Sequence, residues 1–220
     1  MSIRLSKWIV MPAAVLLLGS VALAQDTSAS GSSAQSSGTT TSTPAKQPTI
    51  AERKENQQDR IANGVKSGQL TAGETANLES KEAAVNGETR ADRAANGGKL
   101  THSEKQQINR QQNQLSKQIY QHKHNANSAQ YGNNRVGQRR ENQQDRIAQG
   151  IKSGQLTAGE TAKLENQQRG INQQVKADRA ANGGKLTPGE KQQINKEQNA
   201  ASKNIYNKKH NANTQAGTKK

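Results

Sequence analysis

The large aliphatic side chains after residue 25 recur at helical spacing, and no alternating run of the kind that predicts a strand interrupts them. Ile108, Leu115 and Ile119 are seven and then four residues apart. Ile61 and Val65 are four residues apart, which also places them on one face of a helix. The pattern predicts an all-α protein whose helices cover residues 49–66, 72–95, 102–124, 135–152, 158–181 and 188–210.

The predicted helices belong to two copies of one sequence unit. Residues 55–127 align without a gap onto residues 141–213 at an offset of 86, and about 51 of the 73 pairs are identical. Such self-similarity indicates repeated structural units. Short loops between long helices favour antiparallel neighbours, so the sequence predicts a tandem duplication of a small antiparallel three-helix module. The predicted organisation is a signal peptide (1–24), a disordered Ser/Thr/Gly-rich tether (25–47), helical repeat 1 (48–127), a linker (128–134), helical repeat 2 (135–213) and a basic tail (214–220).

A short element, G-x-L-T-x-x-E, occurs twice in each copy and marks the predicted helix boundaries. A Thr followed three residues later by Glu is a capping box, in which the two residues satisfy each other's backbone N–H groups. The preceding Gly can adopt positive φ and end the helix before it. The predicted structural helix caps are Thr71 with Glu74, Thr101 with Glu104, Thr157 with Glu160 and Thr187 with Glu190.

The N-terminal segment has the features of a bacterial signal peptide. Arg4 and Lys7 precede an apolar stretch over residues 8–18, and a small-x-small sequence ends at Ala24. These features predict cleavage between Ala24 and Gln25, export to the periplasm or beyond, and a mature chain without a transmembrane segment. A retained membrane anchor is the alternative, but the apolar run is shorter than the roughly 20 residues that a spanning helix needs.

The composition leaves little material for a core. Apolar residues make up 29% of the chain and aromatic residues 2%, and Phe and Cys are absent. Disulfide bonds are therefore excluded, and a module with about ten large aliphatic side chains is expected to be only marginally stable. Either packing between the copies or a partner would have to complete the fold.

The formal charge of +15 is distributed unevenly between the copies. Residues 49–127 carry 12 basic and 9 acidic groups, whereas residues 135–213 carry 15 and 7. Candidate partners are phosphorylated lipid headgroups, cell-wall polymers or extracellular nucleic acid, although such charge also serves solubility alone. Because aromatic stacking groups are nearly absent, sequence-specific nucleic-acid recognition is not expected. The candidate polyanion-binding residues are Arg135, Arg139, Arg140, Arg146, Lys208 and Lys209.

The sequence offers no recognisable catalytic arrangement. It contains no nucleophile elbow, no ligand cluster with metal-binding spacing and no Cys. His122 and His124 could bind copper or nickel, but the second copy has Lys208 and His210 at these positions, which favours a solvated helix end. A non-enzymatic protein without a cofactor is expected.

The repeated element resembles motifs of two known protein families. G-x-L-T-x-x-E resembles the second half of an EF-hand loop, which would imply calcium binding. The four loops, however, have no acidic group besides their final Glu, and Arg93 and Arg179 stand where two of them need their first carboxylate. A degenerate calcium module is therefore the third functional interpretation.

The second resemblance fits the expected compartment. Leu100-Thr101-x-x-Glu104 and Leu186-Thr187-x-x-Glu190, each followed by Lys-Gln-Gln-Ile, are similar to the LTxxQ motifs of the periplasmic Spy/CpxP family. The resemblance implies a chaperone or stress adaptor built from long helices. Here Glu replaces Gln, and the motif occurs four times rather than twice. The favoured interpretation is an exported binding or structural module for an envelope macromolecule or an anionic surface, and the Spy/CpxP-like protein is the alternative.

Overall fold

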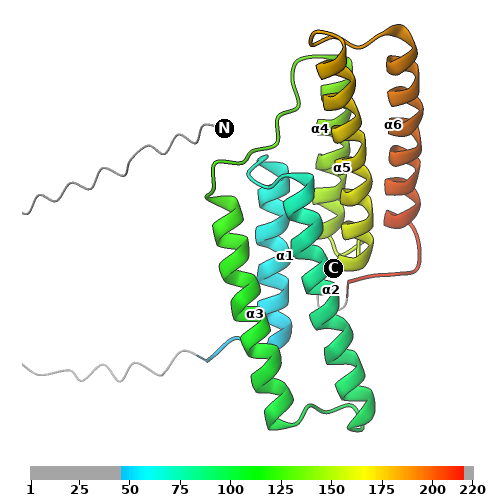
Figure 1. Cartoon of the computed structure of the whole chain (residues 1–220). Coiled ribbons are helices and arrows are strands. Elements are labelled where there is room, and N and C mark those ends of the chain that lie inside the picture. Colours follow the sequence, from blue (N-terminus) through cyan, green and yellow to red (C-terminus); the bar gives the residue numbers. More distant parts are fainter. Residues whose placement is uncertain (1–45, 216–220) are drawn as a thin grey trace, which may run out of the picture. The chain divides into compact units, whose positions relative to one another are not determined.

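The computed structural model describes residues 46–215, which form six α-helices and no strand (Figure 1). The expected signal peptide, its cleavage site at Ala24 and Gln25, nearly all of the tether and residues 216–220 lie outside the described part. The prediction of an all-α protein is confirmed, and every helix boundary lies within one residue of the predicted one. The helices are α1 (Ile50–Lys66), α2 (Ala72–Ala95), α3 (His102–Lys123), α4 (Arg135–Lys152), α5 (Ala158–Ala181) and α6 (Pro188–Lys209).

The helices begin where local side chains satisfy their first N–H groups. At the start of α3, the Thr101 hydroxyl accepts from the N–H of Glu104, and Glu104 Oε2 accepts from the N–H of Thr101 at 2.8 Å. Thr71, Thr157 and Thr187 begin α2, α5 and α6 in the same way. The first helix has an equivalent box, and α4 begins at Asn134, whose side chain accepts from the N–H of Gly137.

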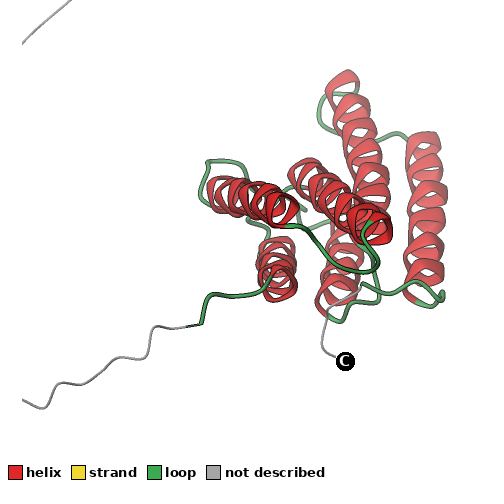
Figure 2. Cartoon of the chain, turned by 90° about the horizontal axis from the view of Figure 1, so that it is seen from below, coloured by secondary structure: helices red, strands yellow, loops and turns green. Residues whose placement is uncertain are grey.

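The two copies pack directly against each other. Helix α2 makes its largest contact with α5, and α1 makes its largest contact with α4. Helices α3 and α6 contact only helices of their own copy and flank the central four on opposite sides (Figures 1 and 2). Because each central helix meets its own counterpart, the copies are related like the subunits of an isologous dimer.

The contact between α2 and α5 is antiparallel. A Cβ atom placed on Gly73 would lie 3.3 Å from Cδ of Arg169, and one on Gly159 would lie 4.0 Å from Cβ of Ala83. Residue numbers therefore rise along one helix as they fall along the other. This register centres on Leu78 and its counterpart Leu164, so the C-terminal ends of α2 and α5 point in opposite directions.

The packing between copies creates one shared core. Of the twenty Ile, Leu and Val residues after residue 25, nineteen are buried. The main cluster contains Ile61 and Leu78 from one copy together with Ile147 and Leu164 from the other. Smaller clusters lie farther out, around Ile108 in one copy and Ile194 in the other. The copies are thus parts of one compact unit, and packing between them supplies the core that each copy lacks.

Buried glutamines attach the third helix of each copy to the first. Gln57 Nε2 donates to the carbonyl of Gln112 at 2.6 Å, and Gln112 Nε2 donates to the carbonyl of Ile50 at 2.9 Å. Gln143 and Gln198 repeat the first of these bonds at 2.7 Å. Backbone carbonyls accept from the N–H groups of these buried amides, whereas Oε1 of Gln57, Gln112 and Gln198 has no hydrogen-bond partner among the described residues.

The Leu70 side chain packs so closely against α1 that a glycine is required near the end of this helix. The N–H of Leu70 donates to the carbonyl of Gly64 at 3.0 Å, and the leucine side chain folds over the helix. A Cβ on Gly64 would lie 2.7 Å from Leu70 Cγ and Cδ1. The second copy repeats this contact between Gly150 and Leu156. Gly87, in α2, has no atom within 4 Å of a Cβ and is not constrained in this way.

We predict opposite effects of alanine at these two helical glycines. Gly64→Ala should lower the free energy of unfolding by about 1–3 kcal/mol, because the added methyl overlaps the buried Leu70 side chain. Gly87→Ala should raise it by about 0.5–1 kcal/mol, because alanine favours the helix and meets no neighbour. Urea unfolding followed by circular dichroism measures both, and stabilisation by Gly64→Ala would contradict the close approach.

Candidate functional site

An open pocket lined by cationic side chains lies where the loop between α2 and α3 meets the start of α1. Its volume is about 600 Å³, and Ile50 and Leu100 contribute apolar surface to it. The basic residues that line it are Arg53, Arg93, Lys99 and Lys105. We call it the first basic pocket.

The second copy contains a matching pocket. It has a volume of about 500 Å³, lies between the α5–α6 loop and the start of α4, and includes Val136 and Leu186. Its basic residues are Arg135, Arg179, Lys185 and Lys191. In this second basic pocket, Arg179, Lys185 and Lys191 are the counterparts of Arg93, Lys99 and Lys105 at the offset of 86.

Local sequence positions these cations. The chain leaves α2 through Gly97 and Gly98, whose φ angles are 59° and 87°, values that favour glycine. Leu100 is then buried, and Thr101 starts α3. The chain therefore turns back within a few residues, which brings the last turn of α2, the loop and the first turn of α3 to one place. The second copy has the same φ angles at Gly183 and Gly184.

The positive charges of the pockets are not paired with acidic side chains in the pocket linings. Neither lining contains an acidic side chain. Arg53 donates to Asn109. The other seven cations form no hydrogen bond or ion pair through their side chains within the described part of the chain. Each pocket thus presents several cations that are available to an anionic group.

The six polyanion-binding residues predicted from the sequence do not form one patch. Arg135 is exposed and lines the second basic pocket. Arg139 donates to Asn195 and Asn199, and Arg146 donates to the carbonyl of Ser202.

The remaining three predicted residues also have contacts within the chain. The guanidinium of Arg140 lies 5.4 Å from the centre of the Tyr131 ring. Lys208 Nζ lies 3.8 Å from Glu160 Oε1. Burial and the nearby Arg146 lower the pKa of Lys209. Arg140 and Lys208 therefore have partners within the fold.

Of the basic residues that line the pockets, the sequence predicted only Arg135; the seven that it did not predict are Arg53, Arg93, Lys99, Lys105, Arg179, Lys185 and Lys191. A signal for all of these except Arg53 exists, because the repeated A-D-R-A-A-N-G-G-K-L-T-x-x-E-K carries three cations at fixed spacing in both copies. From the sequence, that segment is interpreted as a helix boundary and through its family resemblances, and not as a cationic site.

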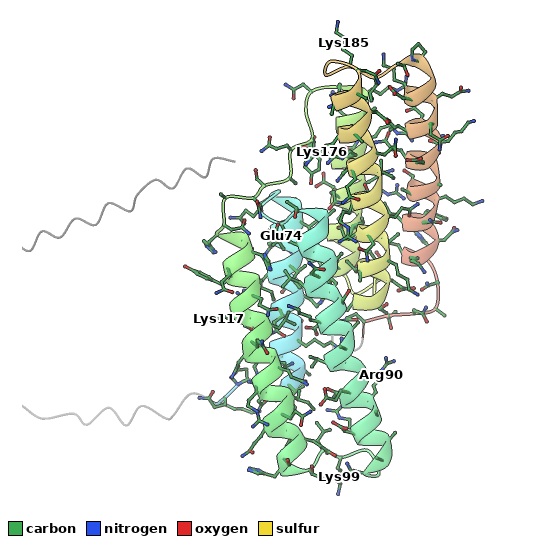
Figure 3. All side chains as sticks on the ribbon, in the orientation of Figure 1. Glu74, Arg90, Lys99, Lys117, Lys176 and Lys185 are labelled. Atoms are coloured by element: carbon green, nitrogen blue, oxygen red, sulfur yellow. The ribbon has the colours of Figure 1, made fainter. Side chains whose placement is uncertain are left out.

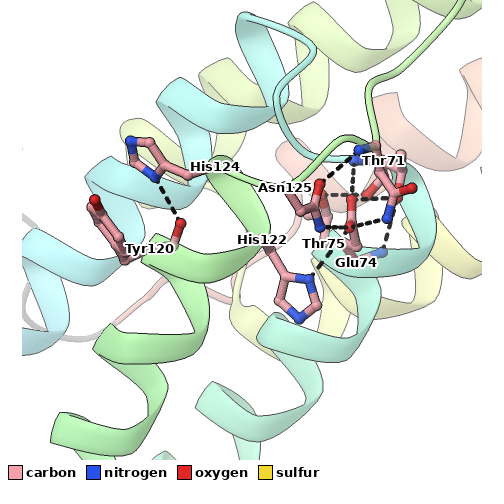
Figure 4. A network of polar contacts seen from close by, with 8 residues as sticks. Thr71, Glu74, Thr75, Tyr120, His122, His124 and Asn125 are labelled. Atoms are coloured by element: carbon pink, nitrogen blue, oxygen red, sulfur yellow. Dashed lines mark hydrogen bonds and ion pairs between the residues drawn. The ribbon is translucent and has the colours of Figure 1, made fainter. Parts of the chain in front are cut away.

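The asparagine-rich segment after α3 forms a polar clasp with the start of α2 (Figure 4). Asn125 and Asn127 donate to Glu74 Oε1 at 2.7 and 3.0 Å, and His122 Nδ1 lies 3.3 Å from the same oxygen. Burial raises the pKa of Glu74, but hydrogen bonds from Asn125 and Thr71 outweigh it and hold the pKa at about 2.

The second copy repeats this clasp around Glu160. Asn211 and Asn213 donate to its Oε1 at 2.6 and 3.2 Å. In the first copy, His124 donates to the carbonyl of Tyr120 at 2.7 Å and stacks on its ring, so it has different contacts from His122. The Lys-His-Asn-Ala-Asn sequences therefore fix the ends of the third helices to the second.

Buried carboxyl groups lie at the contact between the copies. Glu79 and its counterpart Glu165 are fully buried, and each accepts one hydrogen bond, from Gln58 at 3.1 Å and from Gln144 at 2.9 Å. Burial raises the pKa of Glu165 to about 8. Burial also raises the pKa of Glu79, and the charges of Glu82 and Glu165 raise it further.

Glu82 is the third buried acid of this group. Burial raises its pKa to about 7, although the charge of Lys54 opposes the shift. Its counterpart in the second copy is Gln168, which donates to Gln143 Oε1 at 3.0 Å. The equivalent oxygen, Gln57 Oε1, has no partner. A protonated Glu82 could donate to it as Gln168 does in the other copy.

No protein-family model matches this chain, and neither a curated protein nor a solved structure shows significant similarity to it. Among the helices of the described part, none is both long and apolar enough to cross a membrane.

We predict that the protein is most stable near pH 5 and loses stability towards pH 9. Raised carboxyl pKa values mean that the folded state holds protons that the unfolded state has released, so stability falls as pH rises from about 4.5 through about 7 and 8. Below pH 4.5 the low pKa of Glu74 acts in the opposite direction. The expected decline is on the order of 1 kcal/mol per pH unit for each of these carboxyl groups that remains protonated only in the folded state. Urea unfolding at several pH values measures it.

Glutamine variants identify the groups responsible. Glu82→Gln and Glu165→Gln should each flatten the decline and stabilise the protein at pH 8, because they remove a buried charge. The control is Glu141→Gln, at an exposed position. If the two buried variants kept the wild-type slope, the decline would not arise from these carboxyl groups.

Proposed function

We propose that the protein is an exported, non-enzymatic tandem duplication of a three-helix module, which binds anionic polymers through its two basic pockets. One observation carries the proposal. The same trio of cations without side-chain partners, Arg93, Lys99 and Lys105, recurs as Arg179, Lys185 and Lys191 in a second open pocket, and neither pocket contains an acid.

Comparison between the copies shows that the trio is retained although net charge differs. Surface charge differs at some equivalent positions: Glu88 corresponds to Gln174, and Gln111 corresponds to Glu197. Net charge also differs, because the second copy has three more basic and two fewer acidic groups over the compared ranges. The charges of the trio are nevertheless identical in both.

The chemistry of the pockets suits a ligand that carries repeated anionic groups. Lys and Arg side chains bind phosphate, sulfate and carboxylate through charge-assisted hydrogen bonds. Four cations in one open pocket can contact several anionic groups along a chain. No aromatic side chain lines either pocket, so charge rather than stacking on bases would provide the affinity.

The N-terminal features support the location. Positive residues, an apolar stretch and a small-x-small sequence that ends at Ala24 precede the Ser/Thr-rich segment, which carries almost no charge. In this proposal the tether separates the helical unit from the export signal, and the ligand is an anionic polymer of the envelope or the exterior.

We predict that the full chain binds heparin and long-chain polyphosphate and that salt weakens the binding. Changing all six residues of the two trios to Gln should lower the affinity at least tenfold and reduce the dependence on salt, because fewer counterions are released. Isothermal titration at several salt concentrations measures both effects.

The control must separate pocket geometry from total charge. Lys66, Lys117 and Lys203 are exposed and line neither basic pocket. Changing these three to Gln removes as much charge as neutralising one trio but should cost less affinity. Equal losses from the control and from either trio would mean that binding follows net charge alone, and the pockets would not be the sites.

A further inference from the structure

We infer that each molecule is a bivalent bridge, which holds two anionic polymer chains at opposite ends of one rigid helical unit. This inference rests on the proposed function and adds the number of sites, their separation and the consequence for the polymer.

The antiparallel contact between α2 and α5 sets the separation. Each basic pocket includes a loop that follows the C-terminal end of one of these helices. Those ends, Ala95 and Ala181, each lie 17 residues beyond the centre of the contact at Leu78 and Leu164. At a rise of about 1.5 Å per residue, the two ends are about 50 Å apart. In Figure 3, Lys99 and Lys185 lie at opposite ends of the six-helix unit.

The shared core keeps this separation fixed. Helices of both copies contribute to one buried cluster, which includes Ile61, Ile147, Leu78 and Leu164. The clasps at Glu74 and Glu160 hold the outer helices to the same unit. The two pockets therefore cannot swing together onto one short anionic segment.

The distance also makes the two sites electrostatically independent. A separation of about 50 Å is several times the screening length of roughly 8–10 Å at physiological salt. Occupation of one pocket by an anionic chain thus leaves the field at the other pocket unchanged, and a second chain can bind there.

The opposed ends favour a polymer over a membrane. A flat anionic surface that touches the first basic pocket lies on the far side of the molecule from the second. Linear chains can reach both ends and continue past them, so many protein molecules can connect many chains. The expected product is a network of protein and polymer.

Light scattering tests the bridge with long-chain polyphosphate and the full-length protein. Wild-type protein should produce large assemblies, most strongly near equal numbers of pockets and polymer sites, and an excess of either component should dissolve them. Two single-end variants are compared: Arg93→Gln with Lys99→Gln and Lys105→Gln, and Arg179→Gln with Lys185→Gln and Lys191→Gln.

Each single-end variant should still bind polyphosphate in a titration but should lose at least 80% of the scattering signal. An equimolar mixture of the two variants should also fail to assemble, because each molecule has only one intact end. The control variant with Gln at Lys66, Lys117 and Lys203 has the same net charge as either single-end variant. It should assemble like the wild type, which separates bridging from precipitation by charge neutralisation.

Three outcomes would overturn the bridge while leaving binding intact. Assembly by both single-end variants would place the bridging contacts elsewhere. Saturable binding of wild-type protein without any assembly would mean that one chain lies along the whole molecule. Clustering of phosphatidylglycerol vesicles without assembly of polyphosphate would assign the ends to membranes. Absence of any binding of polyphosphate or heparin by wild-type protein would instead reject the proposed function itself.

Discussion

A shortage of aliphatic side chains is the constraint on which this structure depends. Twenty Ile, Leu and Val residues must stabilise six helices, and nineteen of them are buried. Neither copy could enclose a large core with its own ten aliphatic side chains. Packing α1 on α4 and α2 on α5 makes one cluster from both shares, in which Ile61 and Ile147 are fully buried. The same packing directs the two basic pockets away from each other, so core formation and site placement have one cause.

The contact between the copies also buries carboxyl groups. Burial raises the pKa values of Glu79, Glu82 and Glu165 because it disfavours their charged forms. Each of the two equivalent acids, Glu79 and Glu165, receives only one glutamine hydrogen bond. The interface that supplies the core therefore becomes weaker as these groups ionise.

The helices could be predicted from local sequence signals. The contacts between residues far apart in the sequence could not. A capping box such as Thr101 with Glu104 lies within four residues, so the sequence alone located the helix starts. The aliphatic spacing of Ile61 and Val65 is the same whether a helix packs within its copy or against another, and it could not reveal the shared core. The first basic pocket includes Arg53 and Lys99, which are far apart in sequence. The local density of charge in the sequence instead indicated Arg139 and Arg146, whose side chains have partners inside the fold.

Unfolding of a single copy tests the shared core most directly. Residues 46–134 contain all of the first copy but none of the aliphatic residues that α4 and α5 contribute to the main cluster. Circular dichroism of this fragment in urea, compared with the full chain, should show low helix content and no cooperative transition, whereas the full chain should unfold in a single transition. A fragment that is fully helical and unfolds cooperatively at the same urea concentration as the full chain would contradict the account.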